Sequence, residues 1–396
     1  MNQESSDADL RRPYLVIPKL IEQPTWGGQY IVQAKDWDNQ PELASLKIGQ
    51  SYELFSGSNL SLLTSSEDPL FQGELTDRDA VAQQTAPAQS IALQQLLEQS
   101  HEGTLGEARS RDSFMLIKFT QALGNSFQTH VISDKPDPYW QPKPESWYYF
   151  EPGLITLGAK PGIDWDAYEQ AVSAIHDGMT EISKQVKSGA LSFDDAHPRI
   201  KALLAEHDPW QFVNTVPTQT DQLVDLSCGG LHHSWEEDSE QAPLGNVLYE
   251  LCGEAMDKVA TMRSFDKGKM ETDGSIRQLQ IKDYFALVDR RAETNDPAAH
   301  IRKPESLEHT ADYNLDSLLK TPYYNLDKLS LAKSDAHFEE RLTRFKHLFV
   351  KSGRIGVTAG GTTVTVTAGH SCFIPAAAGT YTAKNLADQS EVLISY

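Results

Sequence analysis

The stretch Asn125-Ser126-Phe127-Gln128-Thr129-His130 has the alternation of a β-strand. Successive side chains of a strand point to opposite faces, so residues i and i+2 share one face. Gln128 and His130 are therefore expected to point together into a barrel, while Phe127 and Thr129 point the other way. The strand thus offers an amide and an imidazole on one face.

Two later residues extend this set of possible metal donors. Glu145 and His232 also lie on segments with β character. Two imidazoles, a carboxylate and a side-chain amide make a nitrogen and oxygen site that suits a divalent metal such as zinc. Each residue alone is more often an ordinary polar side chain, so the surrounding sequence must decide between the two interpretations.

Composition and charge narrow the class of protein. The 396 residues are enough for a large core and predict two or three domains. A net charge of -21 argues against nucleic-acid binding, which depends on basic surface. There is no apolar run long enough to span a bilayer, and the polar N-terminus lacks signal-peptide character. Three widely spaced cysteines, Cys228, Cys252 and Cys372, fit no disulfide framework and favour reduced thiols in a cytoplasm.

Most of the chain has the short apolar runs and glycine turns that are typical of strands. We expect strands near residues 14–17, 51–55, 114–119, 126–132, 147–150, 223–228, 246–251, 356–358, 362–366 and 371–375. The regular spacing after residue 340 indicates a sandwich or small barrel. The polar, proline-containing residues 290–340 are expected to form a connector with short helices.

The period changes to that of a helix over residues 164–187. Apolar residues there step by four, three, four and three positions, at Tyr168, Val172, Ile175, Met179 and Ile182. Asp164 is suited to be the N-cap of this amphipathic helix. Further helices are expected over residues 193–206 and 90–98.

Eight short segments resemble known motifs and occur in the same order as in one enzyme family. They are Trp26-Gly27-Gly28, Ile48-Gly49-Gln50-Ser51-Tyr52-Glu53, Leu116-Ile117-Lys118-Phe119, Ser126-Phe127-Gln128-Thr129-His130, Lys143-Pro144-Glu145, Gly229-Gly230-Leu231-His232, Arg263-Ser264-Phe265-Asp266 and Phe373-Ile374-Pro375-Ala376. Together they resemble the type I mannose-6-phosphate isomerases of the cupin superfamily. The resemblance extends through most of the chain.

The resemblance implies a mainly β fold with an α-helical insertion, arranged as two cupin (jelly-roll) β-barrels. Residues 1–160 and 211–290 would form the catalytic cupin region, and residues 161–210 the helical segment. Residues 291–396 would form the connector and a C-terminal barrel without metal. The implied reaction interconverts mannose 6-phosphate and fructose 6-phosphate through an enediol(ate).

The same resemblance assigns ligands and a cofactor. It implies one zinc ion per chain, held by Gln128, His130, Glu145 and His232. Manganese, cobalt or iron could occupy the same donors. His233 directly follows His232, so either imidazole could be the ligand, and the alignment favours His232.

Four cations are candidates for the reaction and for the sugar phosphate. Lys143 and Arg263 would be catalytic, because Lys143 would share the face of Glu145 and Arg263 can hold a phosphate or enediolate by two hydrogen bonds. Lys118 and Lys269 would bind the substrate. The catalytic base stays open between Lys143, Arg263, a histidine and a metal-bound water.

Particular environments are also expected for three charged residues, Lys118, Glu53 and Glu250. Lys118 stands in an apolar strand, where a charge is costly unless it faces a polar cavity. Glu53 and Glu250 are expected to be structural partners of basic residues and not catalysts.

Several departures from the family pattern keep a second class of function in view. Val131 stands where the family usually has proline, Gly230 replaces a threonine, and the spacing from Glu250 to Arg263 is longer than usual. An acidic loop, residues 236–240, follows the expected ligand strand. The rivals are a sugar-binding or degenerate cupin without turnover, and an isomerase of a related aldose. The four intact donors argue against a cupin that binds sugar without turnover.

The expected partner is a small phosphorylated sugar, and neither nucleic acid nor a membrane is expected. The oligomeric state stays open.

Overall fold

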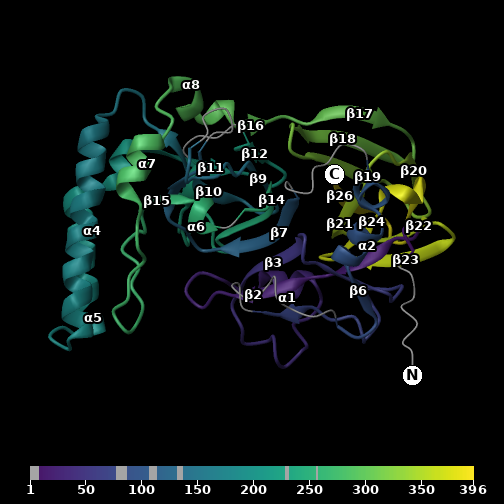
Figure 1. Cartoon of the computed structure of the whole chain (residues 1–396), viewed down its shortest axis with the longest axis horizontal. Coiled ribbons are helices and arrows are strands. Elements are labelled where there is room, and N and C mark those ends of the chain that lie inside the picture. Colours follow the sequence, from purple (N-terminus) through teal and green to yellow (C-terminus); the bar gives the residue numbers. More distant parts are fainter. Residues whose placement is uncertain (1–8, 77–86, 107–113, 132–136, 228–231, 256) are drawn as a thin grey trace. The chain divides into compact units, whose positions relative to one another are not determined.

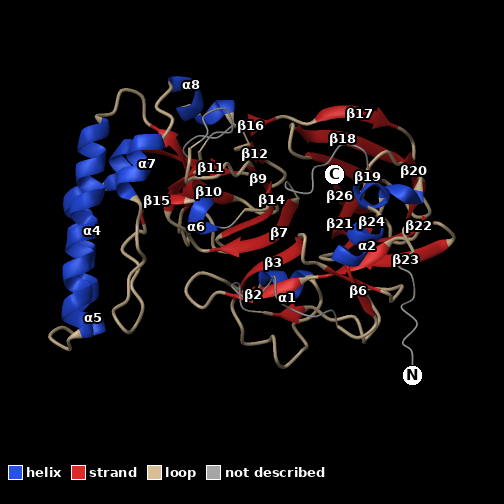
Figure 2. Ribbon diagram, in the orientation of Figure 1, coloured by secondary structure: helices blue, strands red, loops and turns tan. Residues whose placement is uncertain are grey.

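Strands dominate the fold, and the long helices are confined to one segment (Figure 2). The computed structural model describes residues 9–76, 87–106, 114–131, 137–227, 232–255 and 257–396, apart from the side chains of His232, His233 and Asp257. Cys228 and the motif residues Gly229-Gly230-Leu231 lie outside this described part. The chain is mainly β with a helical segment, as the sequence predicts.

Two compact units make up the chain, and each combines distant stretches of sequence. Unit 1 comprises Met1–Gln121, Leu248–Glu254 and Arg302–Tyr396. Unit 2 comprises Ala122–Val247 and Ala255–Ile301. None of the sheets closes into a barrel by strand pairing within the described residues. The cupin arrangement and the expected domain boundaries therefore stay predictions.

Unit 1 consists mainly of antiparallel strands (Figure 1). Its largest sheet has the order β17-β18-β19-β26-β21-β24-β1-β4-β6. The strands are β17 (Glu305–His309), β18 (Tyr313–Lys320), β19 (Asn325–Leu331), β26 (Ser390–Ser395), β21 (Lys346–Ser352), β24 (Ser371–Ile374), β1 (Tyr14–Ile17), β4 (Asn59–Ser61) and β6 (Ser90–Ala92). The N-terminal strand β1 pairs with β24, which places Tyr14 opposite Phe373.

Two further groups of strands complete unit 1. A four-stranded sheet has the order β20-β25-β22-β23, from β20 (His337–Arg341), β25 (Thr380–Asn385), β22 (Arg354–Ala359) and β23 (Thr362–Thr367). The other group has the order β14-β7-β3-β2-β5, from β14 (Asn246–Gly253), β7 (Met115–Ala122), β3 (Ile48–Leu54), β2 (Lys19–Glu22) and β5 (Glu74–Leu75). Short helices connect them: α1 (Tyr30–Ala34), α2 (Leu93–Gln99), α3 (His101–Leu105) and the 3-10 turn η4 (Ala376–Ala378).

The expected connector over residues 290–340 is wrong, because strands occupy most of it from β16 (Ile301–Arg302) to β20. All five residues of β17 are exposed, and the first half of β18 is only partly buried. β17 is the edge strand of the largest sheet and has no buried face, so its sequence lacks the alternation that identifies a strand. The short helix expected over residues 90–98 begins later, at Leu93, after the strand β6.

Among the described residues of unit 2, seven strands form three small groups of paired strands. Its strands are β8 (Phe127–Thr129), β9 (Glu145–Tyr149), β10 (Gly153–Ala159), β11 (Val213–Thr218), β12 (Leu223–Asp225), β13 (His232–Trp235) and β15 (Met262–Phe265). β10 lies between β11 and β13, β8 pairs with β15, and β9 pairs with β12, all antiparallel. The shorter helices are α6 (Asp257–Ala260), α7 (Ile281–Leu287), α8 (Ala292–Asn295) and the 3-10 turns η2 (Pro209–Phe212) and η3 (Pro297–Ala299).

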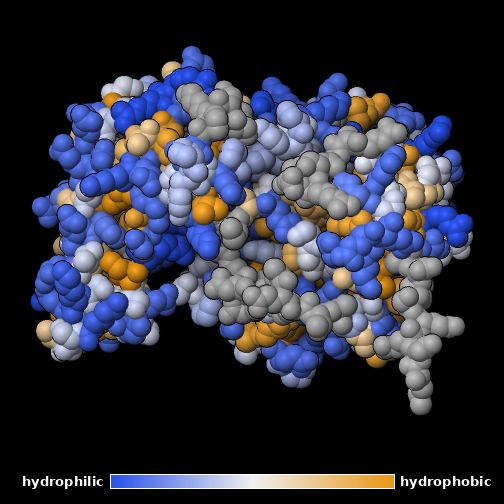
Figure 3. Space-filling view, viewed as in Figure 1, coloured by the Kyte–Doolittle hydropathy of each residue, from blue (hydrophilic) through white to orange (hydrophobic). Residues whose placement is uncertain are grey.

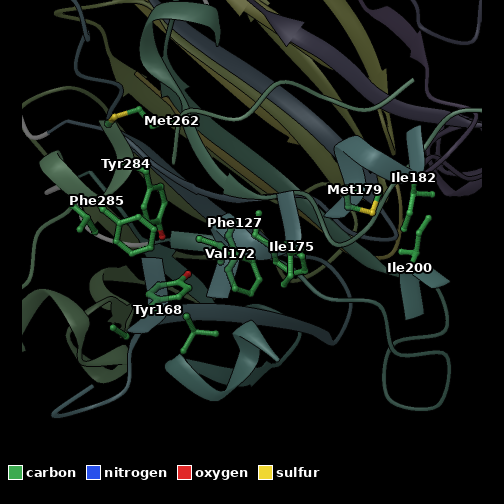
Figure 4. Packing of buried hydrophobic residues seen from close by; sticks show 14 of the residues in the cluster. Phe127, Tyr168, Val172, Ile175, Met179, Ile182, Ile200, Met262, Tyr284 and Phe285 are labelled. Atoms are coloured by element: carbon green, nitrogen blue, oxygen red, sulfur yellow. The ribbon is translucent and has the colours of Figure 1, made fainter. Parts of the chain in front are cut away.

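The helical segment of unit 2 is a pair of helices, α4 (Trp165–Lys187) and α5 (Phe193–His207), that lie side by side (Figure 1). Asp164 caps α4 through Oδ1, which accepts hydrogen bonds from the backbone N–H groups of Asp166 and Ala167 at 3.0 and 3.1 Å. The predicted apolar face of α4 is buried in one cluster with Phe127 of β8 (Figure 4). Phe127 thus packs against the helices while the next residue, Gln128, is free to take the other face of the strand.

The visible face of the molecule is mostly hydrophilic, with small apolar areas between polar side chains (Figure 3). This agrees with the large net charge of -21. None of the described helices combines the length and the apolar character that crossing a membrane requires.

Candidate metal centre

The strand β8 and the residue that follows it carry two of the four expected ligands. Gln128 lies within β8, and His130 follows directly after its last residue. Both side chains are buried, with His130 only 3% exposed. Burial of two polar side chains next to each other requires polar partners, because an unsatisfied buried group is costly.

His130 meets Glu145, the third expected ligand. Its Nε2 lies 3.1 Å from Glu145 Oε2, although the two residues are 15 positions apart in the chain. The other ring nitrogen, Nδ1, forms a hydrogen bond with the carbonyl oxygen of Ala260. When Nδ1 donates to this carbonyl, a neutral imidazole presents its Nε2 lone pair on the side of Glu145, which is the tautomer of a typical histidine ligand.

Burial also favours the protonation state that a metal needs. It lowers the pKa of His130, and the hydrogen bond with Glu145 opposes this effect only in part. A neutral imidazole is the form that binds a metal ion.

Glu145 has two further partners on its own strand segment. Lys143 Nζ lies 2.9 Å from Glu145 Oε2, and Trp147 Nε1 donates to Oε1 at 2.8 Å. Lys143 therefore lies on the face of Glu145, as the spacing predicts. The contact with Trp147 has no signal in the sequence, because an aromatic residue in a strand does not indicate its hydrogen-bond partner.

His232, the fourth expected ligand, is placed only through its backbone. It is the first residue of β13 and pairs with Leu157 of β10. The side chains of His232 and His233 lie outside the described part of the chain. Among the described side chains, no group of three or more His, Cys, Asp and Glu residues is positioned to hold a metal ion. The complete ligand set thus stays a prediction.

Arg263 lies directly across from Gln128 in the pairing of β15 with β8. Gln280 holds this position from outside the strand, because its Oε1 accepts from Arg263 N at 3.2 Å and its N–H donates to Arg263 O at 2.9 Å. Side chains directly opposite each other in an antiparallel pair have Cβ atoms about 5 Å apart. The structure therefore brings Arg263 to the strand of the expected ligands.

The contacts of Lys269 that the structure describes lie within unit 2. Its Nζ donates to the carbonyl oxygen of Gly124 at 2.9 Å, and it lies 4.0 Å from a carboxylate oxygen of Glu237. Burial lowers the pKa of Lys269. Arg277 Nη1 donates to Ser126 Oγ at 3.1 Å, a contact next to the ligand strand that no sequence pattern indicates.

Lys118 belongs to unit 1, whereas the other site candidates belong to unit 2. Its Nζ lies 2.6 Å from Glu250 Oε1, and both side chains are buried. This ion pair explains how a charge is tolerated in the apolar strand β7. Glu53 likewise pairs with the buried Lys35 at 2.7 Å, so both glutamates are partners of basic residues, as expected.

The acidic loop after β13 begins with a carboxylate that is not a surface charge. Glu236 is buried and accepts hydrogen bonds from Ser234 Oγ at 2.6 Å and Trp210 Nε1 at 3.1 Å. Lys267 Nζ lies 2.9 Å from Glu236 Oε2, the same oxygen that accepts from Trp210. Glu236 thus fixes the end of β13, the strand on which His232 lies. No local pattern distinguishes this glutamate from the other acidic residues of the loop.

Comparison with known proteins shows a shared fold. No family model matches the chain, and no curated protein matches it. Among solved structures, the mannose 6-phosphate isomerase from Bacillus subtilis is similar with a TM-score of 0.63 and 14% identity, over 97% of this chain and 99% of that one. A putative mannosephosphate isomerase from Archaeoglobus fulgidus has a TM-score of 0.60 and 14% identity, over 98% and 99%. A zinc-bound mannose 6-phosphate isomerase has a TM-score of 0.61 and 14% identity, over 96% and 98%.

Proposed function

We propose that the chain is a zinc-dependent aldose–ketose isomerase that interconverts mannose 6-phosphate and fructose 6-phosphate. The observation that carries the proposal is the contact of His130 Nε2 with Glu145 Oε2, beside Lys143. The solved structures that share the fold over nearly the whole chain include a zinc-bound mannose 6-phosphate isomerase, which supports this reaction. The proposed architecture is two cupin barrels with the helical segment inserted, and the proposed location is the cytoplasm.

The residues present fit a divalent metal. His130 is buried, which favours its neutral form, and its Nε2 adjoins a carboxylate oxygen of Glu145. We assign the ligands to Gln128, His130, Glu145 and His232, with one ion per chain. When bound, zinc would supply Lewis-acid stabilisation of the negative charge that develops on the sugar oxygens.

The side chains of the chain would carry the remaining tasks of the isomerisation. A proton must leave carbon 2 of the aldose and return to carbon 1, and one hydroxyl proton must move between the two oxygens. Lys143, which contacts Glu145, is proposed to hold or move a proton at the sugar oxygens. Arg263 offers two parallel N–H donors for the enediolate or the phosphate. Lys118 and Lys269 are proposed to contribute to phosphate binding.

Conversion of mannose 6-phosphate to fructose 6-phosphate by the purified chain tests the proposal. Activity should be lost on chelation and restored by zinc, and it should be absent from the His130→Ala variant. No conversion by folded, zinc-loaded protein would contradict the proposal. In that case, binding of the sugar without turnover would favour a non-catalytic cupin, and turnover of another sugar would favour an isomerase of a related aldose.

A further inference from the structure

The two oxygens of Glu145 have different environments. Oε1 accepts a hydrogen bond from the indole nitrogen of Trp147 at 2.8 Å. Oε2 faces His130 Nε2 at 3.1 Å and Lys143 Nζ at 2.9 Å. A carboxylate that can rotate presents either oxygen, or both, to a neighbouring cation. In this structure one oxygen is engaged by a neutral donor, and the other is turned towards the imidazole.

Trp147 itself is held firmly. Glu145 and Trp147 are residues i and i+2 of β9, so their side chains share one face of the strand. Trp147 is fully buried, and its backbone is fixed by pairing with Val224 of β12. Its ring packs against Trp235 with 4.9 Å between ring centroids. Since Trp235 is the last residue of β13, this contact also joins the strand of Glu145 to the strand that begins with His232.

We propose that Trp147 is a positioning residue of the metal centre, whose indole N–H holds Glu145 Oε1 so that Oε2 is the oxygen offered to the metal. This rests on the proposed function, because it requires Glu145 to be a metal ligand. The physical reason is that an outer partner removes rotational freedom from the ligand before the metal arrives. A fixed ligand loses less conformational entropy on binding, so the ion binds more tightly.

The Trp147→Phe variant tests this positioning role directly. Phenylalanine keeps an aromatic ring in the buried position but removes the N–H donor. Zinc affinity, measured on metal-free protein by competition with a chromophoric chelator, should fall about 10- to 100-fold, the usual effect of losing an outer partner of a ligand. The absorption spectrum of the cobalt(II)-loaded variant should also differ from that of the wild type, since the donor oxygen of Glu145 is no longer fixed.

Trp140→Phe is a matched control in the same unit. Trp140 is also buried, and its Nε1 donates to a carboxylate oxygen, Asp283 Oδ2, at 3.1 Å. The control therefore removes the same kind of hydrogen bond from a carboxylate that is not a proposed ligand, and it should keep wild-type zinc affinity and the wild-type cobalt spectrum. An equal loss of affinity in both variants would show general destabilisation and would overturn the proposal.

Wild-type zinc affinity and cobalt spectrum in Trp147→Phe would overturn the proposal while leaving the isomerase function intact. A wild-type protein that binds no zinc would instead refute the proposed function, and the positioning role with it. If Trp147→Phe does not fold, benzothienylalanine at position 147 replaces it, because this residue keeps both rings and has sulfur in place of the N–H group. The same loss of zinc affinity is then expected, and its absence would overturn the proposal.

Discussion

Single residues decide whether the metal centre exists. His130 and Glu145 are both buried, yet each needs a polar partner, and the structure gives each to the other. A buried imidazole and a buried carboxylate in contact are tolerated when a shared proton or a cation satisfies both. Lys143 supplies one cation at this position in the structure, and the proposed zinc would be another.

We expect His130→Ala and Glu145→Ala each to remove most of the bound metal. Each change deletes one proposed ligand, and the remaining donors are too few for tight binding of zinc. Metal content of the purified, folded variants is measured by atomic emission. His197→Ala, which removes an exposed imidazole from α5, should retain the metal. Normal metal content in both ligand variants would refute the site assignment.

Arg263→Ala should keep the metal and lose turnover. Arg263 lies across from Gln128 but is not a proposed ligand, so its loss removes donors for the enediolate or the phosphate. Loss of such a donor typically lowers kcat by about 10²- to 10³-fold. Steady-state kinetics together with metal analysis check this, and Arg199→Ala on the exposed side of α5 is the control. An active Arg263→Ala enzyme would show that the alignment at this position is wrong.

The residues of the centre differ in how far the sequence could predict them. Gln128, His130, Lys143 and Glu145 occur at spacings of two, and alternation in a strand is enough to place each pair on one face. Trp147 and Glu236 could not be found in this way. Their roles depend on partners elsewhere in the fold, such as the indole–carboxylate contact and the buried ion pair with Lys267.

At the scale of elements, the helical segment was predictable and the edge strands were not. The helix α4 begins one residue after its N-cap Asp164 and ends at Lys187, because the apolar period, the capping residue and the burial of one face all agree. The strand β17 has no buried face, so neither period nor composition identifies it. Edge strands are defined by pairing with a neighbour, and pairing partners are not visible in a local pattern.

The strand β13 is fixed at its end by the buried pair of Glu236 and Lys267. Burial lowers the pKa of Lys267, while the charge of Glu236 opposes this. Lys267→Met should destabilise the chain by about 3–5 kcal/mol, because a buried carboxylate is left without its counter-ion. The double variant Lys267→Met, Glu236→Leu should be less destabilised than the single variant, since it leaves no buried charge unpaired.

Urea unfolding of both variants at neutral pH measures these differences in the free energy of unfolding. Lys184→Met, which removes an exposed ammonium from α4, is the control and should change stability little. A single variant as stable as the wild type would show that the pair does not hold the strand.

At the scale of the whole molecule, unit 1 joins the two ends of the sequence. The strand β1 near the N-terminus lies between β24 and β4 in the largest sheet. This sheet therefore combines C-terminal strands with an N-terminal strand. No local pattern predicts this, because the paired residues, Tyr14 and Phe373, are separated by most of the chain. The strand β24 also makes a buried polar contact, since Ser371 Oγ donates a hydrogen bond to the carboxylate of Glu53 at 3.0 Å.

Two buried histidines of unit 1 predict how the stability of the molecule depends on pH. Burial lowers the pKa of His347 to about 3, and burial also lowers the pKa of His370 to about 3. An unfolded histidine has a pKa of about 6.5, so the unfolded chain takes up these protons first as the pH falls. The stability that each imidazole contributes is therefore complete above about pH 6.5 and is lost progressively down to about pH 3.

His347→Gln should reduce this dependence on pH. Between pH 7.5 and pH 5.0, each histidine with these two pKa values lowers the free energy of unfolding by roughly 2 kcal/mol. Urea unfolding at the two pH values should therefore show a smaller difference for the variant than for the wild type, even if the lost contact with Tyr249 lowers its stability at both. His309→Gln, at an exposed position of β17, should keep the wild-type difference. An unchanged difference in His347→Gln would mean that this imidazole takes up its proton over the same pH range in the folded chain as in the unfolded chain.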